Sequence, residues 1–357
     1  MIKRLLLVQI LLSAVVFSAC VNKKPLKVCP ALASGRTAGF ATCLPTNFQP
    51  RDLGSVVAST DHISFIAFGD QGLAGQSRKV AAGIRQYIGT APVRPDLGLV
   101  LGDNFYPRGI ATADSPRWNS DWEQIFGTLV PFYYVVLGNH DRMEASSPYA
   151  EILHTDRSNS WRMPAAYYSF KAGPVQFVAL DTTPLANRND DVQKEWLLNT
   201  LKARGTIWRI AFGHHPLVSG GKHRKDHEVG VMGTDVRQIL EEEDVDLYIS
   251  GHDHDMEFLG PNLGISKSGT LRKIHAAIAG SGSETRPTHP TPSRETRFCA
   301  QQTGFVTVEA SGIELKISFV GVSSEARKLY SCTLRKNSNG IIAADCPPLR
   351  LPRCQTP

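Results

Sequence analysis

Three features are scarce or missing in this sequence. No apolar run is long enough to span a membrane, because the most apolar stretch, Leu5–Phe17, is interrupted by Gln9 and Ser13 and falls short of the roughly 17 to 25 residues that a transmembrane helix requires. No two cysteines have the CxxC spacing that is typical of zinc sites. The basic excess is small: 39 Lys and Arg against 33 Asp and Glu leave a formal net charge of +6, too weak to indicate a nucleic-acid partner.

The N-terminal residues have the pattern of a secretory signal, in which Lys3 and Arg4 precede the apolar run and Ser18, Ala19 and Cys20 follow it. Small residues directly before a cysteine resemble the bacterial lipoprotein cleavage box, in which the cysteine becomes the lipidated first residue of the mature chain. We therefore expect residues 1–20 to be a lipoprotein signal peptide. The mature protein would be exported and anchored in the bacterial cell envelope through Cys20, facing the periplasm or the surface. Simple secretion is the alternative.

Without Cys20, an even set of six cysteines remains. In a chain destined for an oxidising compartment, disulfides are the expected outcome. The six are Cys29, Cys43, Cys299, Cys332, Cys346 and Cys354. Cys29 with Cys43, and Cys332 with Cys346 or Cys354, are plausible local pairs, although one sequence leaves the connectivity open.

After the leader, the pattern predicts a linker followed by one globular domain. Residues 21–61 are rich in Pro, Gly, Ser and Thr without sustained periodicity, which predicts an irregular linker. From His62 onward, short apolar runs of strand type alternate with helical patterns, which predicts an α/β layered fold. The runs expected to form strands are 63–68, 97–101, 133–137, 175–180, 208–212 and 245–249.

Later in the chain, successive strand patterns at 304–308, 313–321 and 329–334 are expected to complete a sheet of the same domain. The domain is therefore expected to span 62–336, and a tail, 337–357, to be tied by a disulfide. The clearest helical pattern is 192–203, behind Asp190 and Gln193 at capping-box spacing. The Pro, Thr and Ser-rich segment 284–296 is expected to be a surface loop.

Five of the six earlier strand runs end in glycine followed at once by a side chain that can bind a metal. The pairs are Gly69-Asp70, Gly102-Asp103, Gly138-Asn139, Gly213-His214 and Gly251-His252. Glycine permits a sharp turn, so each following side chain can project from the carboxyl edge of the sheet, where α/β folds place their ligands. One Gly-Asp pair after a strand is usually only a turn. Five such pairs in one domain indicate a metal site.

The longer strings resemble those of the purple acid phosphatases. They are Gly69-Asp70-Gln71-Gly72, Gly102-Asp103-Asn104-Phe105-Tyr106, Gly138-Asn139-His140-Asp141, Gly213-His214-His215-Pro216 and Gly251-His252-Asp253-His254. Their order and type match the single-domain, tartrate-resistant form from about Ser64 to Leu334. The resemblance implies that residues 62–336 are a calcineurin-like metallophosphoesterase domain. Its fold would be a four-layer sandwich of two mixed β-sheets flanked by helices.

The resemblance also implies a ligand set. In the wider superfamily the first motif is Asp-x-His, but Gly72 stands at the histidine position, and the purple acid phosphatase branch supplies a tyrosine from Gly-Asp-x-x-Tyr, here Tyr106. By this resemblance, the first metal is bound by Asp70, Asp103, Tyr106 and His254, and the second by Asp103, Asn139, His214 and His252. Asp103 would bridge the two.

The donor types suggest which metals fit. Two carboxylates and a phenolate suit Fe(III) at the first site, whereas Asn and two His suit Fe(II), Zn or Mn at the second. The expected reaction is hydrolysis of phosphate monoesters by a metal-activated hydroxide, without a nucleophilic side chain. By resemblance, His140 lies over the phosphate, and His223, nine residues after His214, is a second histidine that acts on the substrate. The alternatives are a structural role for His140 and an exposed loop position for His223.

Two departures from the family pattern leave substrate preference and regulation open. Gln71 stands where the tartrate-resistant form has tryptophan, and the segment 284–296 does not match that form's regulatory loop. A phosphodiesterase, or another metallophosphoesterase that acts on nucleotides or lipids, would use the same ligands, and a non-catalytic surface lipoprotein could retain the fold. We expect a monomer that acts on phosphate esters.

Overall fold

The computed structural model describes residues 51–56, 61–203, 205–261, 274–288, 293–336, 342–347 and 354. All of them belong to one compact unit, Thr46–Pro357. The expected signal peptide, Cys20 and the Cys29 and Cys43 pair lie outside the described residues. Within the described ranges, no helix has both the length and the apolar composition to cross a membrane.

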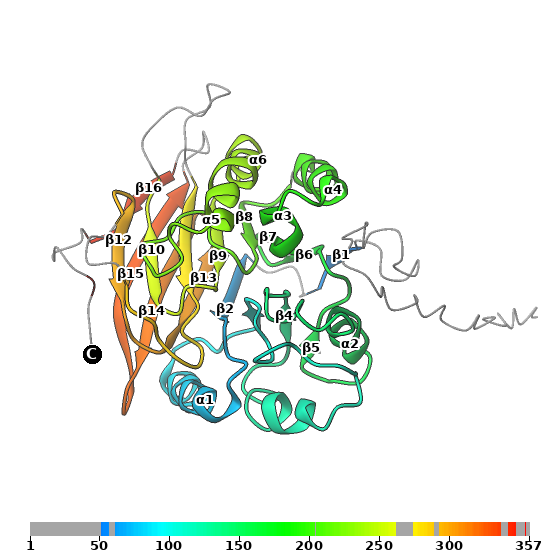
Figure 1. Cartoon of the computed structure of the whole chain (residues 1–357). Helices are drawn as coiled ribbons and strands as arrows, with labels where there is room; N and C mark the ends of the chain where they lie inside the picture. The colour runs from blue at the N-terminus through cyan, green and yellow to red at the C-terminus, as the bar shows by residue number, and fades with distance from the viewer. Residues whose placement is uncertain are drawn as a thin grey trace, which may run out of the picture. The chain divides into compact units, whose positions relative to one another are not determined.

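The strands of the described part of the chain form two sheets, each with eight strands (Figure 1). The first has the order β1 (Arg51–Ser55), β6 (Tyr168–Ala172), β7 (Val175–Ala179), β8 (Trp208–Phe212), β9 (Leu247–Ser250), β11 (His275–Ala279), β10 (Met256–Leu259) and β12 (Thr296–Ala300). The second has the order β16 (Ile342–Asp345), β15 (Ala326–Lys336), β14 (Glu314–Val322), β13 (Gly304–Ser311), β2 (His62–Phe68), β3 (Leu97–Val100), β4 (Tyr133–Val135) and β5 (Trp161–Arg162).

Both sheets are mixed. In the first, β7, β8, β9 and β11 run parallel, and β10 and β12 are antiparallel to their neighbours. In the second, β2 to β5 run parallel, and β13 to β16 are antiparallel. The runs that end in glycine lie among these parallel strands. Parallel strands are covered on both faces, so nearly every side chain along them is buried, which explains their apolar sequences.

A single apolar core lies between the two sheets. It joins alternate side chains of both, such as Phe65 of β2 and Phe177 of β7, whose rings meet edge to face with centroids 5.2 Å apart. A second cluster packs the outer face of the first sheet against helices, with Leu197 and Leu201 of α4 (Asp191–Lys202) among its members.

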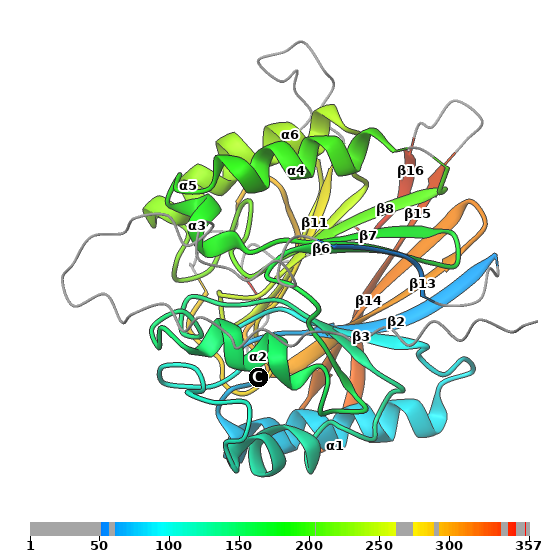
Figure 2. The ribbon, with the colours of Figure 1, turned by 90° about the vertical axis from the view of Figure 1, so that its right-hand side faces the viewer.

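The other helices of the described ranges complete the outer layers. They are α1 (Ala74–Thr90), η3 (Trp118–Glu123), α2 (Ser147–His154), α3 (Thr182–Ala186), α5 (His227–Val231), η4 (Met232–Val236) and α6 (Arg237–Glu242). Figure 2 shows α4, α5 and α6 above the first sheet and α1 below the second. The helices and the two sheets therefore form the four layers that the resemblance implied, and the predicted fold is confirmed.

The expected helix at 192–203 forms as α4 and begins at the predicted cap. Asp190 Oδ1 accepts a hydrogen bond from the backbone N–H of Gln193 at 2.9 Å. The Gln193 side chain then binds Asp181 on both sides: its Oε1 accepts from the Asp181 N–H at 2.9 Å, and its Nε2 donates to the Asp181 carbonyl at 3.0 Å. The cap thus also fixes the chain where it leaves β7.

The sheets extend beyond the predicted limits of the domain. Arg51–Ser55, which falls in the expected irregular linker, pairs as β1 in parallel with β6, and Ile342–Asp345, in the expected tail, pairs as β16 with β15. Both are edge strands. Among the described residues, the disulfides are Cys332–Cys346, one of the two open alternatives, and Cys299–Cys354, a pairing outside those alternatives that joins β12 to the tail. Both bonds tie the tail to the domain, as expected.

Candidate metal centre

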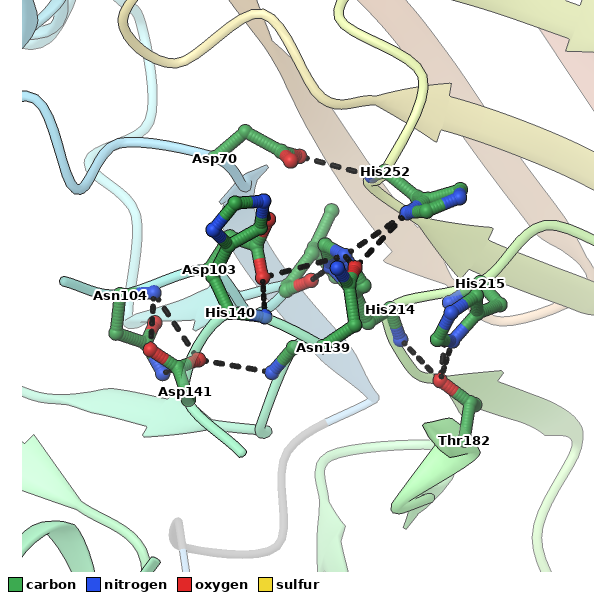
Figure 3. A network of polar contacts seen from close by, with 12 residues as sticks. Asp70, Asp103, Asn104, Asn139, His140, Asp141, Thr182, His214, His215 and His252 are labelled. Carbon is green, nitrogen blue, oxygen red and sulfur yellow. Dashed lines mark hydrogen bonds and ion pairs between the residues drawn. The ribbon is translucent and has the colours of Figure 1, made fainter. Parts of the chain in front are cut away.

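The two sheets meet at the edge where their parallel strands end. Gly69 N, after β2, donates to the carbonyl of Ala279 in β11 at 2.8 Å, and His214 Nδ1, after β8, lies 2.8 Å from the carbonyl of Leu101, after β3. These contacts join loops of different sheets. The loops after β2, β3, β4, β8 and β9 therefore point the side chains that follow their glycines into one region (Figure 3).

Four side chains form the first donor cluster, which centres on the Tyr106 phenol. Its Oη lies 2.8 Å from Asp103 Oδ2, 3.1 Å from Asp70 Oδ1 and 3.2 Å from His254 Nε2. His254 Nε2 is also 3.3 Å from Asp70 Oδ1. These are the four residues expected at the first metal.

Three further side chains form the second cluster. Asn139 Oδ1 lies 3.0 Å from His214 Nε2 and 3.2 Å from His252 Nδ1, and these two ring nitrogens are 3.2 Å apart. Asp103 Oδ1 is 3.5 Å from His214 Nε2. One oxygen of Asp103 therefore faces the first cluster and the other faces the second.

Hydrogen bonds to the backbone orient these donors. His214 donates from Nδ1 to the Leu101 carbonyl, which leaves the Nε2 lone pair directed at the second cluster. Asp70 Oδ2 accepts from the backbone N–H of His252 at 2.8 Å, while Asp70 Oδ1 faces Tyr106. Asp70 thus joins the backbone at His252, in the second cluster, to the first cluster.

The electrostatics of the clusters suit cations. Burial and the charges of Asp70 and Asp103 raise the pKa of Tyr106 far above its usual range, and burial holds the pKa of His252 well below its usual range. Burial alone would lower the pKa of His214, but the charges of Asp103 and Asp70 outweigh burial and raise it. Buried carboxylates beside ring nitrogens are the donors that metal ions select, and a cation would reverse the bias against the phenolate.

The backbone is strained at three of these residues. Asp70, Asp103 and His252 have φ values of 59°, 54° and 70°, in the left-handed region that residues with a side chain seldom adopt. Such strain, about 1 to 3 kcal/mol per residue, is concentrated at functional sites. Of the five glycines before the donors, Gly102 has a positive φ of 87°, so most of the left-handed turns fall on the donor and not on the glycine.

The preceding glycines are needed for close approach. A Cβ added at Gly138 would lie 2.1 Å from Asp103 Oδ1, and one at Gly251 would lie 2.5 Å from Asp70 Oδ2. Gly72 is equally confined, because its Cβ would lie 2.7 Å from Tyr106 N and 2.8 Å from the Asp103 carbonyl oxygen. Position 72, where the wider superfamily has a histidine, is therefore packed closely against the loop that carries Tyr106.

The two predicted substrate histidines lie beside different clusters. His140 sits beside the first cluster: its ring meets that of Tyr106 at 4.7 Å, and its Nδ1 donates to the Pro107 carbonyl at 2.7 Å. The His223 ring lies 4.4 Å from that of His252 in the second cluster. The side chains of His140 and His223 are 32% and 23% exposed, so a substrate can reach both.

Two further residues hold the backbone of the donor loops. Asp141 lies in a motif but had no assigned role, and Thr182 lies outside the motifs. Asp141, the last residue of the third motif string, accepts from the backbone of Gly138 and Asn104, and burial and the charge of Asp103 raise its pKa to about 7. Thr182 Oγ1 accepts from the backbone of His214 and His215 (Figure 3). The chain leaves β7 without a glycine, so the pattern carries no signal for Thr182.

Two more residues approach His254 from the segment expected to be a surface loop. Glu284 Oε1 and Arg286 Nε both lie 3.3 Å from His254 Nδ1, and the Arg286 backbone N–H donates to the His254 carbonyl at 2.9 Å. This segment therefore lies against the first cluster. Nothing in its sequence pattern indicated this contact.

The close approach of Gly138 to Asp103 leads to a stability prediction. Gly138→Ala should lower the free energy of unfolding by about 3 kcal/mol, since the added methyl overlaps the Asp103 carboxylate and backbone. Chemical denaturation measures this. Gly89→Ala is the matched control, because its Cβ would meet nothing within 4 Å in α1 and should stabilise by up to about 1 kcal/mol. Equal effects of the two substitutions would contradict the close approach.

Comparison with known proteins identifies relatives of the whole domain. The chain is 26% identical to purple acid phosphatase 7 of Arabidopsis thaliana over 78% of this chain and 88% of that protein. It is 25% identical to human tartrate-resistant acid phosphatase type 5 over 75% of this chain and 90% of that protein. The resemblance read from the motifs is thereby confirmed.

Solved structures share the fold. GAP50, described as the anchor in the inner membrane complex of Plasmodium, superimposes with a TM-score of 0.62 at 22% identity, over 76% of this chain and 87% of that one. A purple acid phosphatase from yellow lupin (Lupinus luteus) seeds gives a TM-score of 0.63 at 20% identity, over 79% of this chain and 55% of that one. A family profile for calcineurin-like phosphoesterases matches residues 63–256. Since this match covers more than half of the 357 residues, the chain belongs to the calcineurin-like phosphoesterase family.

Proposed function

We propose that this protein is a phosphatase that hydrolyses phosphate monoesters at a dinuclear metal centre. The observation that carries the proposal is the pair of donor clusters that share Asp103, one oxygen in each. The named activities of the relatives, which match over most of their own length, support the same reaction. The ligands proposed are Asp70, Asp103, Tyr106, Asn139, His214, His252 and His254.

The donor atoms of the two clusters differ, which supports two metals of different charge. The first cluster offers two carboxylates and a phenol beside one imidazole, which are hard donors that suit Fe(III). The second offers an amide oxygen and two imidazole nitrogens, which suit Fe(II), Zn or Mn. When bound, such a pair supplies hydroxide at neutral or acidic pH and neutralises the charge of a phosphate dianion.

Two histidines of the site would act on the substrate, one by binding the phosphate and the other by giving a proton to the leaving group. When its ring is protonated on both nitrogens, His140, fixed through Nδ1 to the Pro107 carbonyl, can donate a hydrogen bond from Nε2 to the phosphate. The metal pair would supply the hydroxide nucleophile, and His223 would give a ring proton to the departing oxygen as the P–O bond to the leaving group breaks. Comparing turnover of nitrophenyl phosphate with that of bis(nitrophenyl) phosphate tests the overall proposal. A strong preference for the diester would contradict it and favour a phosphodiesterase, and turnover of neither would favour a non-catalytic protein.

The role of Tyr106 predicts a colour. If its phenolate binds Fe(III), the oxidised protein should be violet from charge transfer, and Tyr106→Phe should lose the absorption band. Tyr87→Phe, in α1, is the matched control and should keep the colour. The visible spectrum and the metal content of the purified protein give both readings. A colourless wild type that is fully loaded with metal and active would rule out the assignment.

The role of His223 predicts a dependence on the leaving group. An aryl phosphate expels a stable phenolate, whereas an alkyl phosphate expels a basic alkoxide that needs a proton. His223→Ala should therefore slow turnover of alkyl phosphates by roughly 100- to 10,000-fold and affect nitrophenyl phosphate much less. Exposed His227, in the neighbouring helix α5, gives the control His227→Ala, which should change neither rate. Equal losses on both substrates would remove the acid role.

We also propose export and lipid anchoring through Cys20, supported by the leader pattern alone. In a bacterial host, Cys20→Ser should abolish lipidation and leave the protein unprocessed or released, while Cys29→Ser should stay with the membrane. Extraction of membranes with and without detergent measures this. Recovery of the wild type in soluble form without detergent would favour simple secretion.

A further inference from the structure

Asp226 lies at the start of a helix, but its carboxylate contacts a histidine and not the helix backbone. It is the residue before α5, where an aspartate carboxylate commonly accepts from the backbone N–H groups of the first turn. The Asp226 side chain makes no such cap hydrogen bond. Its Oδ2 instead lies 2.7 Å from Nδ1 of His223, and its backbone N–H donates to the His223 carbonyl at 2.9 Å. The carboxylate therefore binds the histidine side chain and does not cap the helix.

The backbone of His223 is held by the segment that carries two of the proposed ligands. Asp253, between His252 and His254, accepts from the His223 N–H through Oδ1 at 2.9 Å and from the Ser219 hydroxyl through Oδ2. Glu257 accepts twice from the Gly220 N–H, at 2.9 and 3.1 Å. With its backbone fixed in this way, His223 retains freedom mainly in the rotation of its side chain, which the contact with Asp226 restricts.

Building on the proposed function, we propose that Asp226 is the positioning residue for His223. The Nδ1–H of the imidazole donates to the Asp226 carboxylate, so Nε2 is the ring nitrogen left to meet the leaving oxygen of the substrate. In this arrangement the doubly protonated ring gives its Nε2 proton to that oxygen as the P–O bond breaks, and becomes a neutral imidazole whose Nδ1–H stays bonded to Asp226. Asp226 itself touches neither substrate nor metal.

A cation site is the competing explanation for the same residues. Ligand atoms of His223, Asp226 and His252 lie within 4.8 Å of one another, a spacing that a small ion could also use. However, the side chains of His223 and Asp226 are 23% and 46% exposed, and exposed acidic groups commonly occur in such clusters without an ion. The 2.7 Å separation between His223 and Asp226 is that of a direct, charge-assisted hydrogen bond. The geometry thus favours a carboxylate–imidazole pair.

The test compares Asp226→Ala with Asp226→Glu, which keeps a carboxylate within reach, and with His223→Ala and the double variant. Asp226→Ala should lower kcat on alkyl phosphates by about 10- to 100-fold, leave nitrophenyl phosphate within about twofold, and leave KM and bound metal unchanged. Asp226→Glu should recover most of the rate. The double variant should be no slower than His223→Ala, because the two residues act as one unit. Asp191→Ala, at the start of α4 and 93% exposed, is the control and should match the wild type.

The outcomes separate the two proposals. Equal losses on alkyl and aryl substrates, or a double variant slower than His223→Ala by the full factor of Asp226→Ala, would overturn the positioning role. Loss of bound metal from Asp226→Ala, measured by elemental analysis independently of activity, would overturn it in favour of a cation site. A wild type that turns over neither substrate would contradict the proposed phosphatase function itself.

Discussion

The shared carboxylate of Asp103 is the contact on which the rest of the site depends. Its two oxygens face different donor clusters, and its backbone adopts a left-handed conformation that residues with a side chain seldom adopt. Three surroundings hold it there: the bare α-carbon of Gly138 against the carboxylate, the His140 N–H bonded to Oδ1, and the Gly72 N–H bonded to its carbonyl. The first two come from the loop after β4 and the third from the loop after β2, so the position of Asp103 requires three neighbouring strands, β2, β3 and β4, to end together.

That requirement explains why the site lies where the two sheets meet. The second sheet supplies Asp70, Asp103 and Asn139 from adjacent parallel strands, and the first supplies His214 and His252 in the same way. Neither sheet alone completes a cluster, because each cluster contains donors from both. The bonds that cross between the sheets, such as His214 to the Leu101 carbonyl, therefore align the loops and orient the ring nitrogens at the same time.

Much of this arrangement could be predicted from the sequence, because buried parallel strands read as apolar runs and each candidate ligand directly follows or closely trails one. Edge strand β1 could not be predicted, since Arg51–Ser55 is polar and largely exposed and carries no apolar period. Thr182 and Asp226 were also beyond prediction. Thr182 follows a strand without a glycine, and Asp226 reads as an ordinary residue at a helix start until the rotation of its carboxylate toward His223 is seen.

Tyr106 links the local packing to the kind of ion that the site can hold. The loop from Asp103 to Tyr106 is bonded to Gly72 on both sides, through Gly72 N to the Asp103 carbonyl and Tyr106 N to the Gly72 carbonyl, so no side chain at position 72 can share the space. The phenol that enters instead is buried beside two carboxylates, which raises its pKa far above the usual range. A cation must displace that proton to bind the phenolate, and the field that does so grows with its charge. The tyrosine that stands in for the histidine is therefore the residue on which the proposed preference for a trivalent ion at this cluster rests.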